Sequence, residues 1–299
     1  MFTIYFTIIS MITTLHMKKI LLPIPSKMLR VKNTCLHMIN SKEEPFLIQN
    51  KNSLYLKNQT DFFKDKKLIL LSPGGFKGFY LMGITAFIKE NYVLDDYIFS
   101  GASAGAWNAL LMTYKHNVSE IVNVLLNDEC SKIKDAYSLE KYLKLQIVKN
   151  YKTGDFELEK LFIGLTTISS YGIKTHIYSD FESLDDAVEC CIGSSHIPYV
   201  TGNLINTYHN TYTFDGGFSK YPYLNVSRPV LHITPSMWKH VNNTNTGKVY
   251  KEERVNISDY TTLFSRGKYN FRLLYEEGYN DAKVNQWYLD NILQKIQKK

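Results

Sequence analysis

The sequence predicts an α/β fold, a three-layer αβα sandwich around a mainly parallel central sheet. Two strand–loop–helix units follow one another at residues 68–92 and 97–114, and each strand is a short apolar run typical of a buried parallel sheet. The chain has 299 residues, of which 44% are hydrophobic and 21% charged. This composition supplies enough apolar material for one large domain or two modest ones.

The spacing of apolar residues predicts the individual helices and strands. LILLS (68–72) and YIFSG (97–101) read as the two strands, and the helices after them have apolar residues at helical spacing or are rich in alanine and leucine. Further helical patterns stand at 118–128, 138–149, 157–163 and 184–193, strand patterns at 173–179, 211–215 and 229–234, and an amphipathic helix at 270–297.

A nucleophile elbow is predicted at GASAG (101–105). This G-x-S-x-G pattern stands between an apolar strand and an Ala-rich helix, which is the context that such an elbow requires. The sharp turn would expose the Ser103 hydroxyl and aim the N-terminus of the next helix at the reacting centre. The neighbours must be small because the turn crowds the backbone; they are Gly101, Ala102, Ala104 and Gly105. The plain alternative is a small-residue turn packed under a helix.

A candidate base follows further along the chain. A serine hydroxyl is a weak nucleophile and needs a neighbouring group to take its proton. In TFDGGFSKYP (213–222), Asp215 ends a strand pattern and precedes Gly216 and Gly217, so a tight turn would display its carboxylate. An ordinary Asp-Gly turn is the alternative, but the elbow upstream favours a base.

The glycine-rich loop SPGGFKG (72–78) suits an oxyanion hole, because glycines let backbone N–H groups approach a developing negative charge. A Walker phosphate loop would need Ser or Thr after its lysine, whereas Lys77 precedes Gly78. A dinucleotide fingerprint would need an acidic residue about 20 positions on, where Asp95 and Asp96 stand, so spacing alone leaves it open. The oxyanion interpretation is favoured because it explains three segments together: the glycine loop, the elbow at 101–105 and the Asp-Gly-Gly turn at 215–217.

In this order, SPGGFKG (72–78), GASAG (101–105) and DGG (215–217) resemble the motifs of patatin-like phospholipases. GSSHIP (193–198) is similar to a small-Ser-x-x-x-Pro stretch of that family, and LYEEGYNDA (274–282) resembles its closing helix. The resemblance extends over residues 67–285.

The resemblance implies a lipid acyl hydrolase, a phospholipase A-like serine esterase that works through an acyl-enzyme with a Ser–Asp dyad and no histidine. Ser103 would be the nucleophile and Asp215 the proton acceptor. Two departures concern substrate fit: Ser72-Pro73 replaces the usual Asp-Gly, and Phe76 fills a position that is often small. The implied oxyanion loop comprises Gly74, Gly75, Phe76, Lys77 and Gly78.

Two rival interpretations remain. An α/β-hydrolase-type esterase would use a Ser-His-Asp triad, with His232 or His240 following the acid. The Gly-Gly after Asp215 and the early glycine loop favour the dyad, and His196 is explained equally well as a structural histidine. A lipid-binding module on a decayed hydrolase fold is the other rival, against which the presence of both Ser103 and Asp215 argues.

The net charge and the cysteines indicate which partners, cofactors and location to expect. The chain has 35 basic and 28 acidic residues, and its net charge of +7 permits peripheral contact with an anionic membrane surface. No Lys/Arg block predicts a nucleic-acid partner, so a lipid or phospholipid substrate is the expected partner. The four cysteines form no CxxC pair or His/Cys cluster, so we expect no metal or other cofactor, and a reducing, cytoplasmic or membrane-associated location.

The expected organisation has three parts. Residues 1–66 form an N-terminal arm, residues 67–225 the patatin-like catalytic region, and residues 226–299 a C-terminal strand and helix that complete the same domain. Residues 1–15 are apolar and uncharged, but this run is shorter than the roughly 20 residues of a spanning helix. Residues 1–15 are therefore a candidate for a short membrane segment and not for a full spanning helix.

Overall fold

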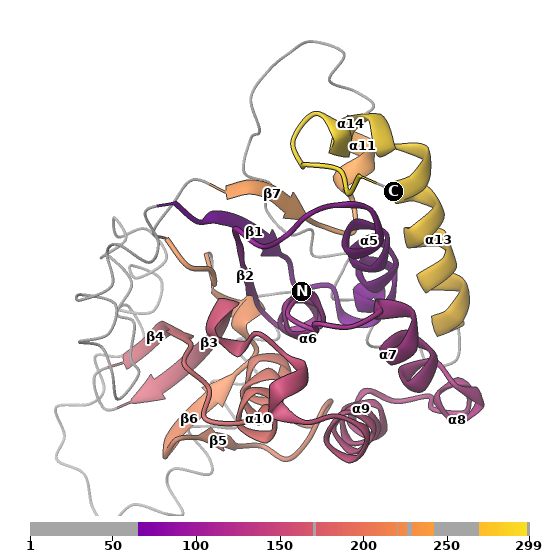
Figure 1. Cartoon of the computed structure of the whole chain (residues 1–299). Helices are drawn as coiled ribbons and strands as arrows, with labels where there is room; N and C mark the ends of the chain where they lie inside the picture. Colours follow the sequence, from indigo (N-terminus) through magenta and orange to yellow (C-terminus); the bar gives the residue numbers. More distant parts are fainter. Residues whose placement is uncertain (1–64, 170–171, 220, 226–228, 242–268, 298–299) are drawn as a thin grey trace, which may run out of the picture. The chain divides into compact units, whose positions relative to one another are not determined.

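The computed structural model describes residues 65–169, 172–219, 221–225, 229–241 and 269–297 (Figure 1). The chain divides into two compact units, Met1–Pro45 and Phe46–Lys299, and the described residues all belong to the second. The candidate membrane segment at residues 1–15 therefore lies outside the described residues, as does nearly all of the expected arm. In the ranges given above, no helix is long and apolar enough to cross a membrane.

A mixed seven-stranded sheet organises the fold, in the order β5-β6-β3-β2-β1-β7, with β4 paired to β3 (Figure 1). Four neighbouring strands run parallel: β3 (Leu161–Ser169), β2 (Tyr97–Gly101), β1 (Lys67–Leu71) and β7 (Pro229–Ile233). Three strands pair antiparallel: β4 (Gly172–Tyr178), β5 (Asn206–Tyr208) and β6 (Thr211–Phe214). The α/β class with a mainly parallel sheet, predicted from the sequence, is confirmed.

The helices begin and end as follows: α5 (Gly78–Asn91), α6 (Ala104–Met112), α7 (Val118–Leu125), α8 (Asp128–Ser131), α9 (Ala136–Asn150), α10 (Leu184–Ser195), α11 (Met237–Val241), α13 (Phe271–Val284) and α14 (Gln286–Asp290). Short 3-10 turns are η2 (Gly75–Lys77), η3 (Thr153–Asp155), η4 (Leu158–Lys160) and η5 (Gly216–Phe218).

Alternate residues of β1 serve opposite faces of the sheet. Ile69 and Leu71 are fully buried in the large core that includes side chains of α5, α6 and α10. Leu68 and Leu70 belong to a second cluster. The other members of that cluster are Ile98, Phe162, Ile177, Tyr223 and Leu224. Since both faces are covered, the continuous apolar run that the sequence shows at 68–71 is explained.

Two predicted elements need correction. The helix expected at 157–163 is wrong: residues 158–160 form only the turn η4, and β3 begins at Leu161. The run LFIGLTTIS is drawn into a strand because it pairs with β2 on one side and β4 on another. The single helix expected at 270–297 is two, because α13 ends before Asn285 and α14 starts after it.

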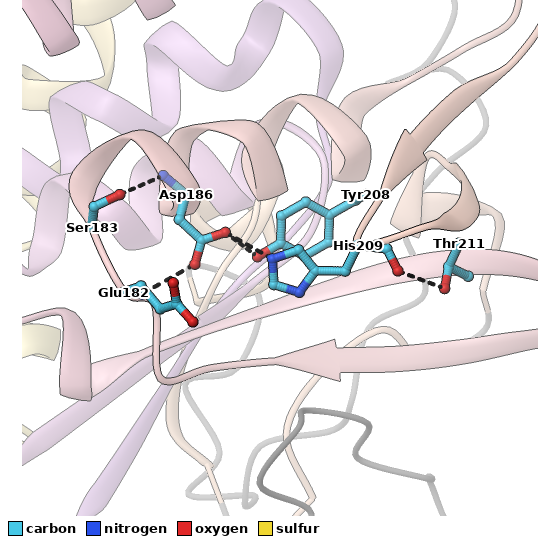
Figure 2. A network of polar contacts seen from close by, with 6 residues as sticks. All are labelled: Glu182, Ser183, Asp186, Tyr208, His209 and Thr211. Atoms are coloured by element: carbon cyan, nitrogen blue, oxygen red, sulfur yellow. Dashed lines mark hydrogen bonds and ion pairs between the residues drawn. The ribbon is translucent and has the colours of Figure 1, made fainter.

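A polar network fixes the hairpin that carries the candidate base (Figure 2). The Tyr208 hydroxyl donates to Asp186 Oδ1 at 2.8 Å, and His209 Nε2 lies 3.1 Å from the same oxygen. His209 and Asn210 have φ values of 45° and 59°, so they form a two-residue turn of the kind that joins tight hairpins. Since β6 runs from this turn directly to Asp215, the first turn of α10 anchors the strand that delivers the acid.

Helices α5 and α13 pack side by side at very close range (Figure 1). A Cβ atom at Gly83 would lie 2.0 Å from the Tyr275 carbonyl oxygen, and one at Gly278 would lie 1.9 Å from the Tyr80 carbonyl oxygen. The Tyr80 hydroxyl also donates to Asp281 Oδ2 at 2.5 Å. Because α5 begins directly after the glycine loop, its packing on α13 also fixes the position of the loop.

We therefore expect Gly83→Ala to destabilise the protein by about 2 kcal/mol or more, since the added methyl group would force two backbones apart. Gly154→Ala is the matched control, because a Cβ atom there meets nothing within 4 Å, and its effect should stay within about 0.5 kcal/mol. Thermal and urea unfolding measure both. Equal stability of the two variants would contradict the close packing of α5 on α13.

Candidate active site

Ser103 sits at a strained turn between β2 and α6. Its φ of 55° and ψ of −128° fall where residues other than glycine are rarely found, and such strain persists only where the surroundings enforce it. A Cβ atom at Gly101 would lie 2.2 Å from the Gly105 carbonyl oxygen, and one at Gly105 would lie 2.0 Å from the Leu71 carbonyl oxygen. Only glycine fits at either position, which explains why the segment reads G-x-S-x-G.

The structure brings Ser103 and Asp215 into direct contact. Ser103 Oγ donates to Asp215 Oδ2 at 2.7 Å, although the two residues come from different elements of the sheet. The Asp215 carboxylate also accepts the Gly217 N–H at 2.6 Å, and its backbone N–H donates to the His196 carbonyl at 2.8 Å. A Cβ atom at Gly216 would lie 2.8 Å from the Ala102 Cβ, so the acid turn is packed against the elbow.

The surroundings of Asp215 tune its basicity. Asp215 is 1% exposed, and this burial raises its pKa from the ordinary 3.8 to about 7. The hydrogen bonds from Ser103 and from the Gly217 N–H act in the opposite direction and stabilise the carboxylate. A carboxyl group that titrates near neutral pH is well matched to accept a proton and return it.

Ser194 supports the elbow from the neighbouring helix. Its hydroxyl accepts the Ser103 backbone N–H at 2.8 Å and donates to the Gly164 carbonyl at 2.7 Å. The Ser103 N–H is therefore occupied. The next N–H, that of Ala104, opens helix α6 and has no carbonyl partner within that helix.

The glycine loop adjoins this site as η2. Gly75 has a φ of 55°, which favours glycine, and a Cβ atom at Gly78 would lie 2.9 Å from the Ala104 Cβ. The N–H groups of Lys77 and Gly78 already donate to carbonyls within the loop. The N–H groups of Gly75 and Phe76 open the turn and have no acceptor within it, so they are the loop's candidate oxyanion donors. Gly74 caps the turn, and a Cβ atom there would lie 3.3 Å from Pro235 Cγ.

A narrow apolar cavity of about 80 Å³ opens at the Ser103–Asp215 pair. Side chains from α5, α6 and α9 line it: Phe79, Met82, Trp107, Ala136, Leu139 and Leu143, together with Phe76 of the loop. Phe79 stacks on Phe271 with ring centroids 4.4 Å apart, so the C-terminal helix α13 supports this wall. The lining suits a hydrocarbon chain.

A buried carboxyl group, Glu140 of α9, also lines this cavity. Ser195 Oγ lies 2.6 Å from Glu140 Oε1 and 2.9 Å from the Cys191 carbonyl oxygen, and it accepts the Trp107 indole N–H at 3.2 Å. A hydroxyl has one proton to donate. If that proton serves the Cys191 carbonyl, Glu140 must supply its own, which fits a neutral carboxylic acid. Burial raises the Glu140 pKa well above its usual range; the Ser195 hydrogen bond opposes this shift and the Asp215 charge adds to it.

Sequence reasoning missed Glu140, Trp107 and Ser195 as members of the site. The available signal was periodicity: Glu140 shares the inward side of α9 with Leu139, Leu143 and other buried residues. An acid at such a position is unusual enough to mark a site.

Of the two histidines considered for a triad, the structure describes the side chain of His232, and this ring packs on another residue. His232 is buried in β7, where its ring packs on Tyr223 at 5.2 Å, and burial lowers its pKa to about 4. The side chain of His240 lies outside the described part of the structure. His196 contributes its backbone carbonyl to Asp215. In the part of the chain that the structure describes, no three His, Cys, Asp or Glu side chains gather in a way that could hold a metal.

Comparison with known proteins gives the family. The model of the patatin-like phospholipase family matches residues 69–225, more than half of the chain, and the chain belongs to this family. The human protein 1-acylglycerol-3-phosphate O-acyltransferase PNPLA3 is 27% identical over 157 residues, which cover 48% of this chain and 32% of that protein. The chain thus matches about a third of this relative's length. VipD from Legionella pneumophila aligns with 78% of this chain and 68% of its own, at a TM-score of 0.38 and 12% identity.

The raised pKa of Asp215 predicts a pH-dependent stability. The acid binds its proton more tightly when folded than when unfolded, so the stability that it contributes is lost as pH rises from about 4 to about 7. We expect the free energy of unfolding of Asp215→Asn to exceed that of the wild type by about 1–3 kcal/mol at pH 8, with a correspondingly higher melting temperature, and the difference should shrink towards pH 4.

Thermal melts across this pH range measure the effect. Asp96→Asn, at a carboxylate whose side chain is 74% exposed, is the control and should show no such trend. A destabilised Asp215→Asn variant at pH 8 would contradict the unfavourable burial of this charge.

Proposed function

We propose that this protein is a lipid acyl hydrolase, a phospholipase A-like serine esterase, in which Ser103 and Asp215 act as a catalytic dyad. The observation that carries the proposal is the direct 2.7 Å hydrogen bond between Ser103 Oγ and Asp215 Oδ2 at a strained elbow. Family membership supports lipid chemistry in general, and the apolar cavity at the pair suits an acyl chain.

In the proposed reaction, Ser103 Oγ attacks the ester carbonyl while Asp215 Oδ2 takes the hydroxyl proton. The oxyanion would be bound by the N–H groups of Gly75 and Phe76, with that of Ala104 as a third donor. Asp215 then gives its proton to the departing alcohol, leaving an acyl-enzyme on Ser103. Water attacks this ester, Asp215 takes the proton, and the fatty acid leaves as Ser103 is reprotonated.

Acyl transfer is the second candidate function. Its support is the name of the human relative, an O-acyltransferase acting on 1-acylglycerol-3-phosphate, which is 27% identical over 157 residues. The same acyl-enzyme would then react with an acceptor hydroxyl in place of water, and Asp215 would activate that hydroxyl. Product analysis with and without a lysophospholipid acceptor separates the two outcomes.

We expect Ser103→Ala and Asp215→Asn each to lower turnover by at least about 1,000-fold, because members of a catalytic unit fail together. The assay is a panel of phospholipid, lysophospholipid, triacylglycerol and short p-nitrophenyl esters, with circular dichroism to verify folding. His232→Asn is the control for the triad, and it should keep activity wherever it remains folded. A folded Asp215→Asn enzyme with wild-type turnover would overturn the dyad.

A further inference from the structure

Helix α9 has an exposed side, opposite the buried side that lines the cavity, and the proposed reaction does not use it. Tyr137, Leu145 and Val148 are 43%, 60% and 40% exposed, and Lys141 is exposed between them. Their spacing places all four along one side of the helix; we call these four residues the outer face of α9. Single exposed apolar residues are normal on a protein surface, but three on one helical stripe form a continuous surface.

This region is rich in lysine, although one of its lysines is paired: Lys144 forms ion pairs with Asp185 and Glu189 of α10. Residues 132–152 contain six lysines and two acidic residues. Of the two acids, Glu140 is buried beside Ser195, and Asp135 accepts the Ser138 N–H as the N-cap of α9. Lys141 Nζ lies 4.1 Å from the centre of the Tyr137 ring, so cation and aromatic ring share the outer face. Exposed apolar side chains interleaved with lysines match an anionic lipid surface.

The outer face adjoins a groove at Tyr137, whose sequence neighbour Ala136 lines the cavity at Ser103. A groove of about 770 Å³ lies at the start of α9, and its lining includes Lys134, Asp135, Tyr137 and Tyr199. Tyr199 is 61% exposed. Ala136 and Thr201, close in sequence to these tyrosines, line the cavity at Ser103. Amphipathic tyrosine rings suit the headgroup level of a bilayer.

We propose that the outer face of α9, with Tyr199 at its edge, docks this protein on the surface of a bilayer that contains anionic phospholipid. This inference rests on the proposed function, since it supplies the route by which a lipid substrate reaches Ser103. Helix α9 lies in the interface: its outer face contacts lipid, while Leu139 and Leu143 on its inner side face the acyl cavity.

The test uses the full chain and vesicles of phosphatidylcholine with or without phosphatidylglycerol. The docking variant is Lys141→Glu/Leu145→Glu, and its matched control is Lys283→Glu/Leu273→Glu on α13. Leu145 and Leu273 are both 60% exposed and helical, and Lys141 and Lys283 are both exposed. The docking variant should bind phosphatidylglycerol vesicles at least about tenfold more weakly than the wild type, whereas the control should stay within about twofold.

Turnover of a water-soluble short-chain ester should stay within about twofold of wild type in both double variants, because none of the four side chains lines the cavity. Wild-type binding should also weaken in high salt, as expected for surface charges. The milder pair Leu145→Ser and Leu273→Ser serves if circular dichroism shows that a double variant is unfolded.

Ser103→Ala separates the two proposals. It should bind vesicles like the wild type while losing hydrolysis. A Ser103→Ala enzyme that hydrolyses esters normally would remove the proposed function and leave the binding comparison valid. Docking through α9 is overturned if the wild type does not bind phosphatidylglycerol vesicles, if the α9 variant binds like the wild type, or if the α13 control loses binding equally.

Discussion

The hydrogen bond between Ser103 Oγ and Asp215 Oδ2 determines how the other parts of the site are placed. It requires two turns, one after β2 and one after β6, to approach until their backbones nearly touch. Glycine makes this approach possible: a Cβ atom at Gly216 would lie 2.8 Å from the Ala102 Cβ of the elbow and 2.2 Å from the Gly164 carbonyl oxygen in β3. The Asp186 network then fixes the hairpin from the far side (Figure 2), and Ser194 fixes the elbow. Position is therefore set by packing, before any substrate binds.

The same arrangement makes the acid useful. A carboxylate in water is too weak a base to take a serine proton at neutral pH, but burial raises the pKa of Asp215 to about 7. Stability and activity are in opposition here, because the charge that the reaction needs is the charge that folding disfavours. Glu140 gives the cavity a second buried carboxyl group, whose neutral form avoids a second negative charge beside Asp215.

Local rules explain what the sequence predicted and long-range packing explains what it did not. The elbow at 101–105 and the glycine loop at 72–78 could be predicted because backbone crowding restricts the residue types within five to seven consecutive positions. The helix predicted at 157–163 is wrong because this segment runs into LFIGLTTIS (161–169), an apolar run compatible with a buried helix or a buried strand. Pairing with β2 and β4 determines that it forms a strand. Glu140 escaped notice because its meaning depends on Ser195 and Trp107, which lie in other helices.

Covalent capture of the Ser103 hydroxyl is a direct test of the Ser103–Asp215 dyad. A fluorophosphonate reacts with a serine hydroxyl only where a base and an oxyanion site act on it together. Intact mass spectrometry should show one adduct per chain, peptide mapping should place it on Ser103, and Asp215→Asn should slow its formation by at least about 100-fold. The dyad would be ruled out if the folded wild-type protein took up no label at Ser103, or if the folded Asp215→Asn variant were labelled as fast as the wild type.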